Sequence, residues 1–296
     1  MLNEEVDRER VAVLGRILLV LSAVLGAVSL FLPVFHGAGS DFSVMDDAGA
    51  RALTFPWLAL LLVAACGVWV HRWQSAVIGS VVVLAVFLGW SAGESLVRAL
   101  DGRWTLWGAG TWTLLGCGVL VTAAAVVLVV SDRPTWESGF GGFSVAVVGL
   151  ALLAVAGRWL STIPYLTVEQ ARNTLPFSPG LIGSSVLTMV AAWWVSRLRP
   201  ARMAGWPVIT LGVLLGCSSL AWAAVVTGSI TRVDGVLGLP IGPGWQVATK
   251  MPAVGSWLQM LAGLAIVGVG LGLLAFTPAA PRNADLSSLD PSQSGH

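Results

Sequence analysis

The hydrophobic pattern divides the chain into apolar segments separated by polar stretches. A helix that spans a bilayer needs about 20 mostly apolar residues. Pro33 closes the first apolar segment, while Pro56 and Pro179 stand where the second and sixth begin. The pattern therefore predicts an all-α, polytopic integral membrane protein with eight transmembrane helices. Each predicted helix comes close to this length of about 20 residues or exceeds it. The eight helices are expected at 15–35, 54–71, 75–95, 110–130, 142–160, 180–196, 206–228 and 253–277.

The polar stretches complete the predicted domain organisation. The N-terminal stretch 1–14 carries Glu4, Glu5 and Asp7, which a secretory signal would not carry, so the first apolar segment is predicted to be a retained anchor. An inner linker is predicted at 131–141. Residues 278–296 are rich in Pro, Ser, Asn and Asp and hold little to bury, which predicts a disordered tail.

The apolar segments follow the same plan twice, which predicts two tandem four-helix repeats at 15–130 and 142–277. The fourth and eighth segments both open with Gly, a hydroxyl residue and Trp, at 110–112 and 255–257. Because each repeat has an even number of helices, the two are expected to share one topology about an axis along the membrane normal. The third and seventh segments both lead into an arginine, an aspartate and a glycine, which are Arg98, Asp101 and Gly102 in one case and Arg232, Asp234 and Gly235 in the other.

Each half resembles the small four-helix membrane proteins of actinobacteria. The resemblance is carried by an apolar-Pro step that closes the first helix and by the Gly-hydroxyl-Trp start of the fourth. These residues are Leu32-Pro33 with 110–112 in the first half, and Ile163-Pro164 with 255–257 in the second. The resemblance implies a pair of four-helix units and no particular activity.

Basic residues and tryptophans indicate the orientation. An N-terminus on the inner side places nine basic residues there and seven on the outer side, as expected from the positive-inside rule. Most of the tryptophans fall near one boundary or the other, as in an aromatic belt. We therefore expect a multi-pass protein of the cell membrane with both termini in the cytoplasm.

Composition narrows the classes of function. Hydrophobic residues make up 56% of the chain and charged residues 10%, and the formal net charge of +1 gives no reason to expect nucleic-acid binding. Three cysteines and three histidines are too scattered to suggest a disulfide framework or a metal site. We expect no metal and no cofactor, and the predicted partners are the lipid bilayer and a second membrane protein.

Charged residues near the outer ends of the third and seventh segments are the candidate contacts for a ligand or partner. Glu94 and Arg98 lie one helical turn apart and can pair on one face. Arg98 with Asp101, and Arg232 with Asp234, would form a charged girdle at the outer surface. An interfacial ion pair is the favoured explanation of Glu94 and Arg98, and turn chemistry is the favoured explanation of the two aspartates.

Three functions stay open at this point. The central parts of the apolar segments carry almost no ionisable residues, which favours a non-enzymatic accessory or interaction subunit over coupled transport or catalysis. The duplication, with Glu94 and Arg98, favours instead a transporter or lipid-handling protein with a site between the halves. A membrane-embedded enzyme would need an acid–base pair from the outer loops, where the carboxylates are Asp41, Asp46, Asp47 and Glu169.

Overall fold

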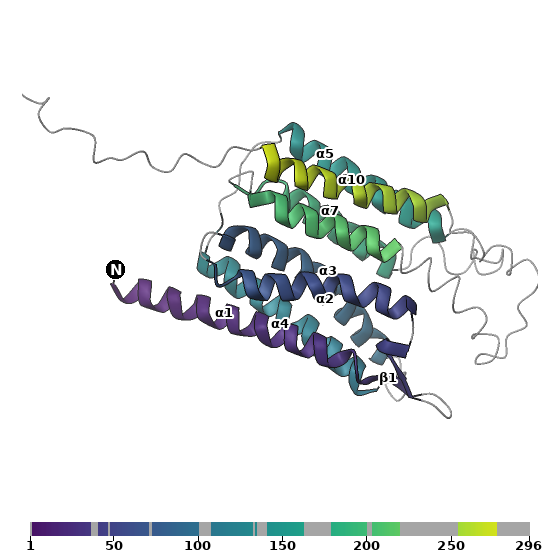
Figure 1. Ribbon diagram of the computed structural model, residues 1–296, viewed down its shortest axis with the longest axis horizontal. Coiled ribbons are helices and arrows are strands. Elements are labelled where there is room, and N and C mark those ends of the chain that lie inside the picture. The colour runs from purple at the N-terminus through teal and green to yellow at the C-terminus, as the bar shows by residue number, and fades with distance from the viewer. Residues whose placement is uncertain are drawn as a thin grey trace, which may run out of the picture.

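The structure is an antiparallel arrangement of helices with one short β-hairpin (Figure 1). This computed structural model describes residues 2–36, 41–46, 48–70, 73–100, 108–132, 134, 141–162, 179–199, 203–219 and 254–276. Its elements in chain order are α1 (Leu2–Ser29), β1 (Pro33–His36), β2 (Asp41–Ser43), a 3₁₀ turn (Val44–Asp46), α2 (Ala48–Gly67), α3 (Gln74–Leu100), α4 (Ala109–Asp132), α5 (Gly142–Thr162), α7 (Pro179–Val195), the helix Met203–Ser219 and α10 (Val254–Phe276).

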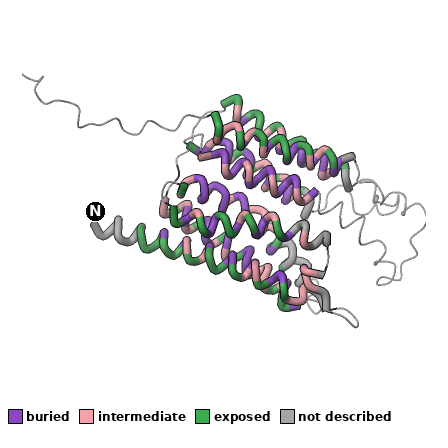
Figure 2. Tube along the Cα trace, in the orientation of Figure 1, coloured by how far each residue is buried: buried purple, intermediate pink, exposed green. Residues whose placement is uncertain are grey.

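Five helices are long and apolar enough to cross a membrane. They are Glu9–Ser29 within α1, Gln74–Gly93 within α3, α4, Gly142–Leu160 within α5, and Gly255–Phe276 within α10. Three further apolar helices are shorter in the described part of the chain, at Thr54–Gly67, Ile182–Val195 and Met203–Ser219. Buried residues follow the sides where helices meet, and exposed residues cover the outside (Figure 2). Leucines and valines are among the most exposed, so the outer surface is itself apolar.

The helices form two groups that follow chain order. In the first group α1 packs against α4 and α2, and α4 also packs against α3. In the second group α5 packs against α10 and α7. The groups meet where α3 lies beside α7 (Figure 1). At this junction the Trp90 ring covers Gly183, and Pro207 lies against Gly79. The described junction is therefore a packed contact.

Several helix boundaries differ from those predicted, most clearly in the first two helices. The first helix ends at Ser29, and Pro33 begins β1, which pairs antiparallel with β2. The second helix begins at Ala48, so Pro56 lies inside it and not at its start. Proline in a helix removes one backbone hydrogen bond. The apolar pattern marked where residues can be buried in lipid, and the helices extend or stop according to local hydrogen bonding.

The β-hairpin is tied to the start of α4 through Val34. The Val34 carbonyl oxygen accepts hydrogen bonds from the Gly108 backbone nitrogen at 2.9 Å and from Thr111 Oγ1 at 2.6 Å. Gly110 lies so close to the hairpin that a methyl group there would be 2.7 Å from the Leu32 carbonyl oxygen. The Gly-Thr pair at 110–111 therefore fixes the hairpin at the start of α4.

Very close helix packing joins Met203–Ser219 to α10. A methyl group at Gly263 would lie 2.6 Å from the Gly216 backbone nitrogen, and one at Gly212 would lie 2.6 Å from the Gly263 carbonyl oxygen. Further along, Gly205 meets the Gly270 carbonyl oxygen in the same way. Small residues allow backbones to approach in this manner. Contacts pair low residue numbers with high ones, so the two helices run antiparallel.

Glycines four residues apart, at 89 and 93, 212 and 216, and 268 and 272, form a pattern that predicts close helix packing, and the structure agrees with it in part. Gly212 and Gly216 lie in the close contact, and Gly89 packs on the Thr122 side chain. By contrast, no described atom lies within 4 Å of a methyl group built at Gly93, Gly268 or Gly272. The α10 glycines that matter, Gly263 and Gly270, are seven residues apart, which a search for four-residue spacing misses.

The glycine contact predicts a difference between two substitutions in α10. Gly263→Ala is expected to lower the free energy of unfolding by about 1–3 kcal/mol, because its methyl group meets backbone that cannot rotate away. Gly268→Ala adds the same methyl group where the described structure leaves space. It is expected to change stability by less than about 1 kcal/mol. Unfolding of the purified protein in detergent would measure both. Equal destabilisation by the two changes would contradict the contact.

Candidate functional site

The charged residues singled out by sequence lie outside what the structure describes in detail. Glu94 and Arg98 are within the α3 helix, but their side chains are not among those described. Asp101, Arg232 and Asp234 lie outside the described residues altogether. The outer-loop carboxylates Asp41, Asp46, Asp47 and Glu169 are in the same position, because none has a described side chain. These residues stay predictions.

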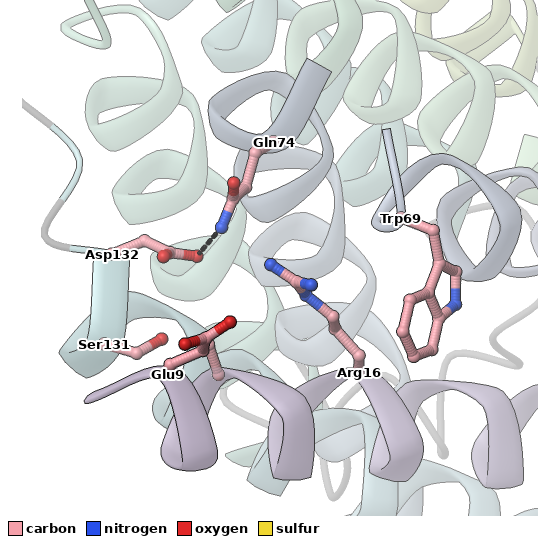
Figure 3. A pocket seen from close by; sticks show the side chains of 7 residues that line it. Glu9, Arg16, Trp69, Gln74, Ser131 and Asp132 are labelled. Carbon is pink, nitrogen blue, oxygen red and sulfur yellow. Dashed lines mark hydrogen bonds between the residues drawn. The ribbon is translucent and has the colours of Figure 1, made fainter. Parts of the chain in front are cut away.

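A polar cavity of about 380 Å³ lies at the opposite end of the first helix group. It is lined by residues from three helices (α1, α3 and α4) and the turn after α2, namely Glu9, Ala12, Arg16, Trp69, Gln74, Ser131 and Asp132. Figure 3 shows the Arg16 guanidinium between Trp69 on one side and the carboxylates of Glu9 and Asp132 on the other. The cavity therefore brings both signs of charge together beside an aromatic ring.

Helix geometry places these side chains around one space. Glu9, Ala12 and Arg16 are three and four residues apart in α1, so they share a face of that helix. Gln74 is the first residue of α3 and Asp132 is the last of α4. The cavity thus forms where one helix runs past the ends of two others.

Arg16 combines an aromatic contact with an unsatisfied donor. Its guanidinium carbon lies 5.6 Å from the centroid of the Trp69 ring, within the range of a cation–π interaction. Its Nε atom is buried and has no hydrogen-bond partner among the described residues. A buried donor without a partner costs free energy. Arg16 is therefore held in place while keeping a donor unused.

Asp132 is fixed by Gln74 across the cavity. The Gln74 amide nitrogen Nε2 donates a hydrogen bond of 2.6 Å to Asp132 Oδ2, which joins the start of α3 to the end of α4 (Figure 3). Hydrogen bonds to an ionised acceptor are shorter and stronger than neutral ones. The carboxylate therefore has a defined position beside Arg16.

Sequence reasoning missed this cavity although it used two of its residues in other ways. Arg16 is one of the nine basic residues expected on the inner side, and Trp69 is one of the tryptophans expected in the aromatic belt. The signal was present, because Arg16 is an ionisable residue inside an apolar segment, and such residues are costly unless they have a role. Asp132, however, is 116 positions further along the chain. Nothing in the local pattern pairs the two.

A second polar cluster is buried between α10 and the helix Met203–Ser219. Gln259 Nε2 donates hydrogen bonds to the Leu215 carbonyl oxygen at 3.0 Å and to Ser218 Oγ at 2.8 Å. Ser219 Oγ donates to the carbonyl oxygen of Ser256. Gln259 is only 5% exposed and its amide nitrogen is satisfied by the neighbouring helix. This cluster joins the two helices through hydrogen bonds.

Within the described residues, no three His, Cys, Asp or Glu side chains gather closely enough to hold a metal ion. No protein-family model, curated protein or solved structure matches the chain. The resemblance of each half to the four-helix membrane proteins of actinobacteria therefore stays a prediction, and functional argument rests on the chain's own geometry.

Proposed function

We propose that the chain is a multi-pass membrane protein in which all eight apolar helices cross the bilayer, with both termini in the cytoplasm. The positions of the helix ends support this proposal. The cavity brings together the first part of α1, the start of α3 and the end of α4. Trp73 and Trp206 stack at the same end, with ring centroids 5.4 Å apart, and Gly205 there meets Leu274 near the end of α10. Helices that alternate in direction with both chain ends on one side fit an even number of spans.

The two helix groups are proposed to be tandem repeats. In each group the first helix packs against the second and the fourth, as α1 does on α2 and α4, and as α5 does on α7 and α10. The third helix of each group also packs against the fourth, which in the second group is the glycine contact. Equivalent neighbours in both groups support a duplication.

Protease accessibility in intact cells tests the proposed orientation. Epitope tags at the two termini are expected to resist an external protease until the cells are permeabilised, because both ends are proposed to face the cytoplasm. A tag inserted between Thr162 and Pro179, which is proposed to be outside, is the matched control and should be cleaved in intact cells. Cleavage of either terminal tag in intact cells would refute the topology.

Within that architecture, the function that we propose is that of a non-enzymatic accessory or interaction subunit. The observation that supports this proposal is that polar side chains inside the helix groups donate hydrogen bonds to neighbouring helices. Gln259 bonds to the neighbouring helix, Trp159 Nε1 donates to Ser185 Oγ at 3.0 Å, and Ser144 Oγ donates to the Ser196 carbonyl oxygen at 3.1 Å. The last two bonds join α5 to the α7 region at both ends. Polar groups that tie helices together favour a fixed scaffold over a moving pathway.

Purification from native membranes in mild detergent tests the accessory role. A second membrane protein is expected to co-purify in a stoichiometric amount, identified by mass spectrometry, because a scaffold without its own chemistry acts through what it binds. The control is an unrelated tagged membrane protein of similar size, purified in parallel. A protein that is consistently recovered alone would contradict the proposal.

The alternative is a transporter or lipid-handling protein with a site between the two helix groups. Two features favour it, namely the proposed duplication and the position of Glu94 in α3, the helix that contacts α7. If it is right, Glu94→Gln should abolish uptake of whichever lipid or small molecule co-purifies, at normal expression, because it removes the charge. Glu4→Gln, near the N-terminus, is the control for the charge change. Uptake that does not respond to Glu94→Gln would eliminate this site.

A further inference from the structure

We propose that the cavity around Arg16 binds the headgroup of a phospholipid that carries a primary amine, such as phosphatidylethanolamine. Arg16 would hold the phosphate, and the carboxylates of Asp132 and Glu9 would hold the ammonium group. This inference uses the membrane location proposed above, but it does not depend on the accessory role.

The phosphate position follows from the unused donor on Arg16. Its Nε atom is buried and has no partner among the described residues, while the Trp69 ring supports the guanidinium at 5.6 Å. A guanidinium offers donors in a planar fork that matches phosphate oxygens. A phosphate bound here satisfies a donor that is otherwise left unpaired inside the protein.

The ammonium position follows from the two carboxylates. Glu9 and Asp132 line the cavity on the side away from Trp69 (Figure 3). Gln74 fixes Asp132 through Oδ2. A primary ammonium has three donors and can reach both carboxylates, whereas a trimethylated ammonium has none. The carboxylates therefore select an amine that can donate hydrogen bonds.

The balance of charges excludes a simple anion. The lining contains one guanidinium and two carboxylates, so a headgroup with a negative charge alone would meet repulsion from Glu9 and Asp132. A zwitterion places its phosphate and its ammonium against groups of opposite sign. The cavity volume of about 380 Å³ falls within the range usual for small-ligand sites.

The position of the cavity fits a lipid better than a soluble compound. Tryptophans typically mark the headgroup level of a bilayer, and Trp69 lies at the cavity with 54% of its surface exposed. Exposed apolar residues continue from the cavity along the Arg16 side of α1, at Val20 and Val24, which are four and eight residues after Arg16. These side chains offer a surface for the acyl chains of a lipid whose headgroup occupies the cavity.

Native mass spectrometry of the full chain in mild detergent tests this proposal. The protein is offered equal amounts of phosphatidylethanolamine, phosphatidylcholine and phosphatidylglycerol. Wild-type protein is expected to retain phosphatidylethanolamine about tenfold more than either of the others, which is the gain from about one additional charge-assisted hydrogen bond. Equal retention of all three lipids, or preference for phosphatidylglycerol, would overturn the proposal.

Two substitutions separate the roles of the lining residues. Arg16→Gln is expected to lower retention of phosphatidylethanolamine about tenfold, whereas Arg10→Gln, an exposed arginine of α1 that does not line the cavity, leaves it unchanged. Asp132→Asn keeps an acceptor for Gln74 but removes the charge. It should reduce the preference over phosphatidylcholine, and it serves as the test if Arg16→Gln fails to fold. Retention unaffected by Asp132→Asn and by a folded Arg16→Gln protein would also refute the site.

A soluble competitor identifies the source of the headgroup. Ethanolamine phosphate carries the same two charged groups without acyl chains. At millimolar concentration it is expected to leave the bound lipid in place, because it lacks the apolar contacts. Displacement of the lipid at that concentration would assign the site to a soluble phosphorylated amine and overturn the lipid. Recovery of the chain in the soluble fraction would instead refute the membrane location, a separate failure.

Discussion

The arrangement of the helices depends on how closely their backbones can approach. When the surroundings of apolar helices are also apolar, the hydrophobic effect contributes little to helix association. Association must then come from close packing and hydrogen bonds. The glycine contact between Met203–Ser219 and α10 provides the packing, and the Gln259 cluster beside it provides the bonds. The α1 and α4 helices use the same means more sparingly, since Gly15 receives the Leu128 side chain. In each helix group small residues therefore allow close approach, and buried leucines such as Leu19, Leu128 and Leu211 fill the space between the helices.

Much of the helical architecture could be predicted from the sequence because helices long and apolar enough to cross a membrane appear in it as long apolar runs. The segments expected at 75–95, 110–130, 142–160 and 253–277 agree with α3, α4, α5 and α10 within a few residues. The helix ends were harder to predict, because a helix boundary depends on hydrogen bonds that do not affect the hydropathy of the sequence. The hairpin at Pro33 is the example, because it is held by Thr111 and Gly108, more than 70 positions away. The seventh segment, expected at 206–228, agrees with the described helix as far as Ser219, and the expected tail lies outside the described residues.

The candidate site could not be predicted for a different reason. Sequence analysis searched for charges where they cluster along the chain, which led to Glu94, Arg98 and Asp101, and to Arg232 and Asp234. The Arg16 cavity instead joins charges that are far apart in sequence and close in space. One arginine in a long apolar run was visible from the start, but its partners depend on which helix ends meet, and that is a property of the fold. A search for isolated charges at the ends of apolar segments would have produced Arg16 and Asp132 together without saying that they touch one cavity.

The spacing of the glycines in the second helix group also limits how that group can move. Gly205 and Gly212 face Gly270 and Gly263, so glycine recurs every seven residues on both helices. Sliding one helix past the other by a single turn would bring bulky side chains such as Ile209 and Val267 against backbone where glycine is now required. The two helices can therefore pack against each other in only one register. Any rearrangement of this part of the protein has to move both helices together as one rigid unit. Relative motion is then confined to the neighbouring helices.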